Sequence, residues 1–209
     1  MIKIENTEVF GWEAAIRGMR NPMNSWHLSD TKYYDDGGVF RVPEIGEVDL
    51  KLMRNLAKAG SDHAKYLRMI NVTFDCTAPL YWWKEADTYA VGVVKNSCST
   101  MHKIHAKEFT LDDFSHEHLD YISIGWLTSL VEHLNYVRED YNETKSKDKW
   151  WQMIQLLPSS YNQKRTVQLN YQVLLNMYRA RKNHKLDEWR EFCKWVETLP
   201  YFKEVLLDE

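Results

Sequence analysis

Two stretches of the chain have the side-chain pattern of a β-strand. Residues 1–10 place Ile2, Ile4 and Val9 between polar neighbours, an alternation typical of an edge strand. Residues 70–79 carry β-branched and aromatic side chains and stop at Pro79, which predicts a second strand.

Elsewhere the apolar residues recur at helical spacing, and charged or Pro-containing segments separate the runs. The sequence predicts helices over 12–19, 43–59, 115–139, 165–182 and from Trp150 to before Pro158, with a charged linker over 141–149 and a short helix holding His63. The last helices carry Leu186, Trp189, Cys193 and Val196. Two helices have apolar stripes: one formed by Ile45, Val48, Leu52 and Leu56 and stopped by Gly60, and one formed by Leu119, Ile122, Trp126, Leu130, Leu134 and Val137. We therefore expect an α/β fold, with a small antiparallel sheet covered by long amphipathic helices.

The stretch from Ile70 to Lys103 should form a pocket wall. After the strand we predict a short helix from Leu80 that Gly92 ends, and then a polar loop. The loop places hydrogen-bonding groups at the mouth of the pocket, from Asn96, Ser97, Ser99 and Thr100.

In the predicted helix over 165–182, a polar residue stands at each end of an apolar stripe. Asn170, Leu174, Met177 and Arg181 fall on this stripe, whereas Gln172 and Asn176 share a different face. Two interpretations of Arg181 remain open. It brackets a buried surface together with Asn170, or it forms an ion pair at the helix C-terminus.

Length and composition are those of an ordinary globular protein. The 209 residues predict one domain over 1–209, and the net charge of −3 gives no case for nucleic-acid binding. No apolar run reaches membrane-spanning length, and no signal peptide opens the sequence. Three scattered cysteines favour a reducing cytoplasm. The nine Trp and twelve Tyr should serve the core and subunit contacts, the latter including Trp126 and Trp150.

Other chemistries have weaker support. Cys76, Cys98, His102, His105, His116 and His118 lack the spacing of a zinc site, so we expect no metal. The Asp35-Asp36-Gly37-Gly38 segment fits a solvated turn better than a metal site. Cys98 as a nucleophile would need a lowered pKa from Lys95 or His102, and an inert thiol is the simpler interpretation. No glycine-rich phosphate loop is present.

At the central stretch the chain resembles the flavin-dependent thymidylate synthase family. That family has a His, a strand ending in Ala-Pro, and a helix leading into RHRxxSxNExSxRY. Here His63 precedes the strand, Ala78-Pro79 closes it, and Asn96 and Ser99 match the motif. Thr88, Tyr89 and Ala90 fall where RHR belongs, with one extra residue in the link to Asn96. Ser97, Met101 and His102 stand for the motif's Glu, last Arg and Tyr.

A second block supports the resemblance. Leu157-Pro158 is followed at the family's spacing by NYQVLLNMYRAR, which matches NxRxLxNxxxxR except that Gln172 replaces its first Arg. Glu188-Trp189-Arg190 resembles the closing Glu-Ile-Arg, and Ala14-Ala15-Ile16-Arg17 is a weaker likeness near the start.

The resemblance implies a homotetramer that binds FAD at subunit interfaces. NADPH would reduce the flavin, and a methylene group from methylenetetrahydrofolate would reach C5 of dUMP. Carried over by position, the flavin contacts are His63, Asn96, Asn170 and Asn176. Ser99 and Arg181 would face the reacting nucleotide, with Lys95 as a further substrate contact.

The departures from the family pattern concern positive charge. The motif's RHR and last Arg are absent, and Ile154 stands where relatives have Arg. Lys84, Lys95 and Lys103 can compensate only as point charges, without the guanidinium fork. Two functions remain open: a divergent enzyme of this family, or a non-catalytic homologue that keeps the oligomeric fold but has lost flavin and dUMP binding. In the second case aromatic residues such as Trp82, Trp83 or Tyr89 would fill the pocket.

Overall fold

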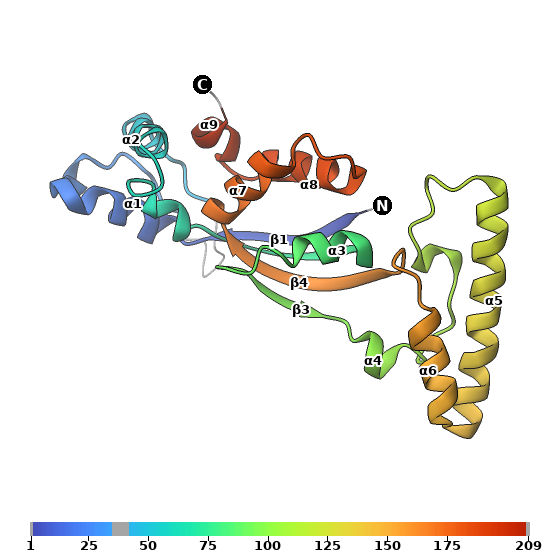
Figure 1. The fold of residues 1–209 in the computed structure, drawn as a ribbon. Coiled ribbons are helices and arrows are strands. Elements are labelled where there is room, and N and C mark those ends of the chain that lie inside the picture. Colours follow the sequence, from blue (N-terminus) through green and yellow to red (C-terminus); the bar gives the residue numbers. More distant parts are fainter. Residues whose placement is uncertain (1, 35–41, 208–209) are drawn as a thin grey trace. The chain divides into compact units, whose positions relative to one another are not determined.

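The structure is a computed structural model that describes residues 2–34 and 42–207 (Figure 1). The turn predicted at Asp35-Asp36-Gly37-Gly38 lies outside the described residues. Within the described ranges, no helix combines the length and the apolar character needed to cross a membrane.

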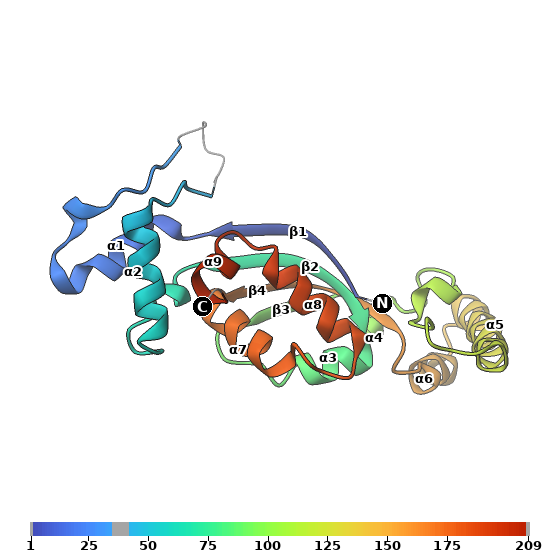
Figure 2. The ribbon, with the colours of Figure 1, turned by 90° about the horizontal axis from the view of Figure 1, so that it is seen from above.

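Four strands form an antiparallel sheet in the order β1-β2-β4-β3 (Figure 2). They are β1 (Lys3–Phe10), β2 (Asn71–Pro79), β3 (Val94–Ser97) and β4 (Asn162–Asn170). The predicted edge strand and the predicted Ala-Pro strand are therefore confirmed. Two side-chain contacts fix the register of β1 on β2: Asn6 donates to Asp75 at 2.9 Å, and Thr73 donates to Glu8 at 3.3 Å.

Contacts divide the chain into two compact units, each assembled from separate segments. The first unit comprises Cys76–Thr88, Asn96–Thr166 and the residues up to Lys3. The second unit comprises Ile4–Asp75, Tyr89–Lys95 and the residues from Val167 onward. The chain passes between the units within each of the four strands and also between Thr88 and Tyr89, outside the strands. The single domain over 1–209 stays a prediction.

The first unit has its core between α5 (Tyr121–Thr144) and α6 (Lys147–Leu156). It also contains α3 (Leu80–Ala86), α4 (Thr100–Lys103) and the short 3-10 turn η4 (Leu111–Asp113). The buried cluster consists of Ile104, Phe109, Phe114, Leu127, Val131, Leu134, Val137 and Met153. On β4, the carbonyl of Gln163 accepts a 2.9 Å hydrogen bond from the indole of Trp83, which holds α3 to the strand.

The second unit contains α1 (Trp12–Arg20), α2 (Glu47–Lys58), α7 (Tyr171–Arg181), α8 (Asp187–Glu197) and α9 (Phe202–Leu206). Three 3-10 turns complete it: η1 (Asn21–Met23), η2 (Trp26–Leu28) and η3 (Lys65–Arg68). Helix α8 packs on β2, because the ring of Phe74 lies 4.5 Å from Trp195 and 6.4 Å from Phe192. Burying each such aromatic side chain contributes on the order of 1.5–3 kcal/mol.

A buried ion pair joins α1 to α2. Arg20 Nε donates to Asp49 Oδ1 at 2.6 Å, and the two side chains are only 3% and 0% exposed. The second oxygen of Asp49 accepts from the hydroxyls of Ser29 and Thr31 at 2.6 and 2.7 Å. Burial alone would raise the pKa of Asp49, but the hydrogen bonds from Ser29, Thr31 and Arg20 together lower it below its usual value.

Two predicted apolar stripes are wrong in detail. Helix α2 begins at Glu47, not Pro43, because the Asp30 carboxylate accepts from the backbone amides of Val48 and Asp49. Its buried positions are Asp49, Leu50 and Met53, whereas Val48 is 51% exposed.

The helix predicted over 115–139 also starts later. Asp120, not Ser115, caps α5 by accepting from the Ser123 amide at 2.8 Å. Its buried stripe is Leu127, Val131, Leu134 and Val137, so Ile122 and Trp126 face outward. The charged segment predicted as a linker over 141–149 is mostly the end of α5 and the start of α6.

Strands replace predicted helix and loop in two places. Residues 162–170 form β4, because Gln163, Val167 and Leu169 are buried at the two-residue spacing of a strand. The predicted polar loop is largely β3 and α4, and the Cys98 amide donates to the Lys164 carbonyl of β4 at 2.9 Å.

The predictions for two short segments are also wrong. Helix α3 ends at Ala86 and not at Gly92, since the Thr88 hydroxyl binds the Glu85 carbonyl at 2.7 Å. His63 lies in a turn before η3 and not in a helix.

Candidate functional site

The segment from Tyr89 to Lys95 lies along α7 in the second unit. Gly92 has φ +73°, and a Cβ added there would lie 3.4 Å from Val173 and 3.5 Å from the Asn170 amide nitrogen. Lys95 Nζ donates to the Tyr89 carbonyl at 3.4 Å, which closes the segment on itself. The segment thus brings Lys95 and Asn170, both predicted site residues, into one local structure.

Arg181 is held against two aromatic rings at the other end of α7. Its Nε donates to the Tyr89 hydroxyl at 3.0 Å. The guanidinium carbon lies 4.9 Å from the ring centroid of Trp189 and 5.6 Å from that of Tyr89. Such cation–π contacts contribute about 0.5–2 kcal/mol each. These contacts hold the plane of a partly exposed cation in one orientation, and the alternative of an ion pair at the helix C-terminus stays open.

Trp189 supplies the rigid side of this cluster. It is fully buried on α8, and its ring meets those of Tyr89 and Phe192 edge to face. The ring of His184 lies 6.4 Å away. In the sequence, Tyr89 and Trp189 stand out only as motif positions or core residues, and their contact with Arg181 was not predicted. The one available signal was that Tyr89 falls in the RHR segment of the aligned motif.

The predicted amide contacts flank α7. Asn170 caps the helix by accepting from the Val173 amide at 3.1 Å. Gln172 donates to Asn176 at 3.1 Å, which confirms that these two side chains share a face. Asn170 itself ends β4 and precedes the helix, so it does not stand within the helix as predicted.

The remaining predicted site residues lie elsewhere in the chain. His63 is exposed in the second unit, and Asn96 is exposed on β3 in the first unit. Ser99 belongs to the first unit and caps α4, where its oxygen accepts from the His102 amide at 3.1 Å. The structure therefore gathers Lys95, Asn170 and Arg181 in one unit and places Asn96 and Ser99 in the other.

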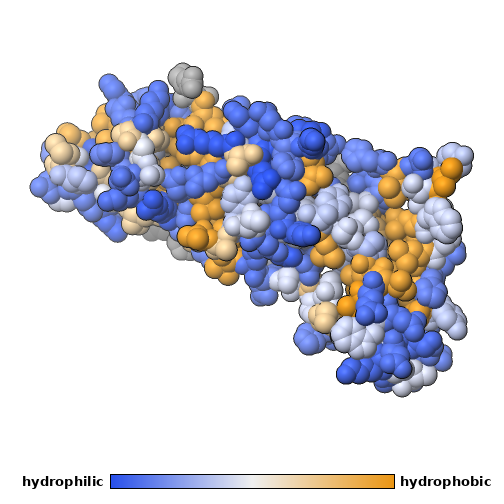
Figure 3. Space-filling model, in the orientation of Figure 1, coloured by the Kyte–Doolittle hydropathy of each residue, from blue (hydrophilic) through white to orange (hydrophobic). Residues whose placement is uncertain are grey.

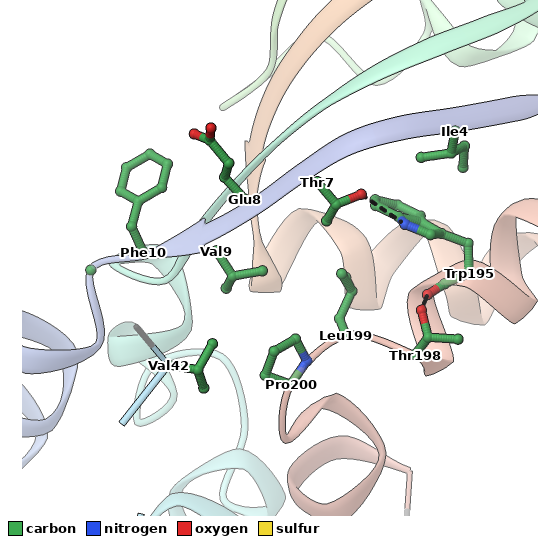
Figure 4. A pocket seen from close by; sticks show the side chains of 11 residues that line it. Ile4, Thr7, Glu8, Val9, Phe10, Val42, Trp195, Thr198, Leu199 and Pro200 are labelled. Carbon is green, nitrogen blue, oxygen red and sulfur yellow. Dashed lines mark hydrogen bonds between the residues drawn. The ribbon is translucent and has the colours of Figure 1, made fainter. Parts of the chain in front are cut away.

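A cavity of about 1180 Å³ lies in the second unit between β1 and the end of α8 (Figure 4). It is lined mainly by apolar side chains, and Trp195 closes one side by donating to Thr7 at 3.3 Å. The Glu8 carboxylate points away from Val9 and Leu199 in Figure 4. No predicted site residue lines this cavity, so its size alone does not make it the site of chemistry.

The thiols differ in access. Cys76 and Cys193 are buried, whereas Cys98 is exposed. Burial raises the pKa of Cys193 to about 11 and that of Cys76 further still. Among residues 2–34 and 42–207, no three His, Cys, Asp or Glu side chains lie close enough together to hold a metal ion.

No family model matches the chain, and no curated protein matches its sequence. The crystal structure of flavin-dependent thymidylate synthase ThyX from Helicobacter pylori, complexed with FAD and dUMP, is similar with a TM-score of 0.70. The match covers 99% of this chain and 98% of that chain at 15% identity. A second structure of the H. pylori enzyme with FAD and dUMP has a TM-score of 0.68 at 16% identity, over 100% and 98% of the chains. The chain therefore has the fold of the flavin-dependent thymidylate synthases, as its sequence resemblance predicts.

Proposed function

We propose that the protein is a divergent thymidylate synthase-like enzyme that binds FAD and methylates dUMP or a related nucleotide. NADPH and methylenetetrahydrofolate would be its co-substrates. The fold it shares with two structures that contain FAD and dUMP supports this proposal. The observation that carries it for this chain is Arg181, which Tyr89 and Trp189 hold in one orientation.

The donor set of the second unit fits a flavin nucleotide in its chemistry. A flavin ring presents neutral carbonyl and imide groups, and Asn170, Asn176 and His63 offer hydrogen-bond donors and acceptors. The phosphate of the nucleotide substrate would require positive charge, which Lys95 and Arg181 carry. By resemblance, Asn96 would be a further amide contact to the flavin. When bound, FAD would supply the hydride chemistry that no side chain of the protein provides.

The residues of this chain would bind and orient the nucleotide. A guanidinium whose plane is already fixed loses little freedom on meeting an anionic oxygen, so it favours charge at that position. The Ser99 hydroxyl accepts one hydrogen bond from the protein and can also donate one to a substrate oxygen. Lys95 would add a point charge. Fewer arginines than in the family pattern should make nucleotide binding weaker and more sensitive to salt.

We also propose that the active form is a homo-oligomer, a tetramer by resemblance. The first turns of α5 expose large apolar side chains, with Tyr121 at 85%, Trp126 at 72% and Ile122 at 54%. A helix face of this kind is typical of a protein–protein interface. We expect a second copy of the chain to cover it.

The second candidate function is a non-catalytic homologue. The position of Tyr89 favours it, because an aromatic residue stands where the family motif has RHR and already binds Arg181. In that case the aromatic cluster would stabilise the fold, and neither FAD nor dUMP would bind.

Titration of the FAD-supplemented protein with dUMP separates the two candidates. Isothermal calorimetry should detect binding, and Arg181→Gln should weaken it by about 10–100-fold, since a lost charged hydrogen bond is worth about 1.5–3 kcal/mol. Arg179→Gln is the matched control, because Arg179 is an exposed cation on the same helix. Release of tritium from C5 of labelled dUMP then reports turnover. No dUMP binding in the wild-type protein would overturn the proposal in favour of the non-catalytic homologue.

A further inference from the structure

Two side chains of β4, Gln163 and Arg165, contact the stretch of chain that leads to Ser99. All the residues involved belong to the first unit. We propose that Gln163 and Arg165, called the β4 clamp below, are positioning residues that hold Ser99 where its hydroxyl can meet a nucleotide. The role of Ser99 toward the nucleotide rests on the proposed function, whereas the β4 clamp itself rests on the contacts of these two side chains.

Gln163 fixes the backbone immediately before Ser99. Gln163 is only 8% exposed, and its Nε2 donates to the Cys98 carbonyl at 2.7 Å. The Cys98 amide donates to the Lys164 carbonyl of β4 at 2.9 Å. Both backbone polar groups of Cys98 are therefore bound to one strand, and a side chain makes one of the two bonds. The direction in which the chain continues to Ser99 is thus set by β4.

Arg165 determines which way the Gln163 amide points. Arg165 Nε donates to Gln163 Oε1 at 3.0 Å, so the amide oxygen is occupied and the NH2 group faces the Cys98 carbonyl. If the amide turned over, two donors would meet at Arg165 and two acceptors at Cys98. Arg165 therefore acts on Cys98 through Gln163.

Arg165 is itself held at the end of α3. Its Nη1 donates to both carboxylate oxygens of Asp87, at 2.8 and 3.1 Å, and its guanidinium carbon lies 4.2 Å from the ring centroid of Trp83. Trp83 is 1% exposed, and its indole donates to the Gln163 carbonyl at 2.9 Å. A planar guanidinium with five donors can bind a carboxylate, an amide oxygen and a ring face together. The strand and the helix thus give the β4 clamp one rigid support.

The place of these contacts along the chain explains why they matter for Ser99. Asp87 comes directly before Thr88, where the stretch aligned with the family's RHR begins, and Cys98 comes directly before Ser99. The RHR arginines, which could anchor this stretch through charged hydrogen bonds, are absent from the chain. The β4 clamp instead attaches it to β4 at two points. We therefore expect the placement of Ser99 to depend on Gln163 and Arg165.

Hydrogen exchange of the full chain, without flavin or nucleotide, tests whether the β4 clamp holds the turn before Ser99. Gln163→Met keeps the approximate size of the side chain but removes its donor. The exchange rate of the amides in residues 96–103 should rise roughly 3–10-fold, as expected for the loss of one hydrogen bond. Gln168→Met, at an exposed position of the same strand, is the matched control and should leave that rate unchanged.

Two further comparisons show whether the effect is local and how Arg165 takes part. Residues 127–137 of α5 contribute to the apolar core of the first unit (orange at the right of Figure 3) and should keep wild-type exchange in every variant. Arg165→Met should raise the exchange rate of residues 96–103, and combining it with Gln163→Met should raise the rate no further. Unchanged exchange in both single variants would overturn the β4 clamp, and full additivity would overturn the action of Arg165 through Gln163.

A double-mutant cycle with Ser99 separates positioning for the nucleotide from a general effect on stability. In the FAD-supplemented protein, Gln163→Met should weaken dUMP binding roughly 3–10-fold. In a Ser99→Ala background the same substitution should change dUMP affinity less than about twofold, because no hydroxyl remains to be positioned. Equal weakening in both backgrounds would assign a merely structural role and overturn the proposal. If the wild-type protein binds no dUMP, the proposed function fails, and the exchange rates alone decide whether the β4 clamp holds the turn.

Discussion

The Tyr89 hydroxyl accepts a 3.0 Å hydrogen bond from Arg181 Nε, across 92 positions of sequence. Tyr89 lies in the segment aligned with the lost RHR motif, and Arg181 is the arginine that the later motif retains. The contact therefore links a position where the family's positive charge is missing to one where it remains. It makes Tyr89 a positioning residue for Arg181.

Tyr89→Phe should loosen Arg181 without removing the aromatic ring. We expect the free energy of unfolding to fall by about 0.5–1.5 kcal/mol, the value of one hydrogen bond. The affinity for dUMP should fall by several fold, because the guanidinium loses its fixed orientation. Urea unfolding and calorimetry measure the two effects. Tyr136→Phe, at a 63% exposed position, is the control and should change neither. An unchanged dUMP affinity in Tyr89→Phe would remove the positioning role.

Asp49→Asn should strongly destabilise the second unit. It leaves the Arg20 guanidinium buried without its counter-ion, which typically costs about 3–5 kcal/mol. The exposed pair of Glu13 and Arg17 is the matched control, and Glu13→Gln should cost less than about 1 kcal/mol. Chemical denaturation followed by tryptophan fluorescence provides the measurement. Similar losses of unfolding free energy in the two variants would show that the buried pair contributes no more to stability than the exposed pair.

The Asp49 carboxylate should make the stability of the protein depend on pH in the acid range. Because the pKa of folded Asp49 is below its unfolded value, its contribution is fully present above about pH 4. The contribution is lost as the pH falls through the lower, folded pKa. Unfolding curves at a series of pH values should therefore show an acid loss of stability that Asp49→Asn lacks. A parallel acid loss in both proteins would assign the effect to other groups.

Only one thiol should react in the folded protein. Cys98 is exposed, whereas Cys76 and Cys193 are buried with raised pKa values. An aromatic disulfide reagent should modify about one thiol per chain before denaturation, because the thiolate is the reactive form. Cys98→Ser should abolish this rapid reaction. Rapid modification of two or three thiols would contradict the burial of Cys76 and Cys193.

Trp126→Gln should weaken association of the chain with itself. Trp126 is 72% exposed on α5 and makes a large apolar contact available to a second copy. Sedimentation at a series of concentrations should show a homo-oligomer for the wild-type protein and smaller species for the variant. Trp26→Gln is the control, because Trp26 is 49% exposed and lies outside α5. Trp195 does not serve as a control, because it packs on Phe74. A monomeric wild-type protein would rule out the proposed assembly.

The sequence predicted elements best where side-chain pattern and burial coincide. The strand that closes at Pro79 and the helix that carries Trp189 and Val196 have one clear buried face, so their spacing was informative. The four-residue β3 is at the edge of the sheet and largely exposed, so no hydrophobic pattern marks it. Residues 165–170 were predicted as helix, because only Val167 and Leu169 are both apolar and buried in β4.

The candidate site was predictable only as a set of positions. The motif spacing singled out Asn170, Asn176 and Arg181, and the cap made by Asn170 could follow from local chemistry. The contact of Arg181 with Tyr89 and Trp189 could not, because it depends on how distant segments pack. The apolar stripe predicted for α5 includes Ile122 and Trp126, which are 54% and 72% exposed, because apolar spacing alone does not distinguish a buried helix face from an exposed one.

The visible absorption spectrum of the purified protein, before and after incubation with FAD and desalting, tests the central claim most directly. The proposed function predicts a retained flavin spectrum at close to one FAD per chain, with a shift on addition of dUMP that Arg181→Gln reduces and Arg179→Gln does not. A protein that stays colourless after incubation, with no change in thermal stability on addition of FAD or dUMP, would contradict it.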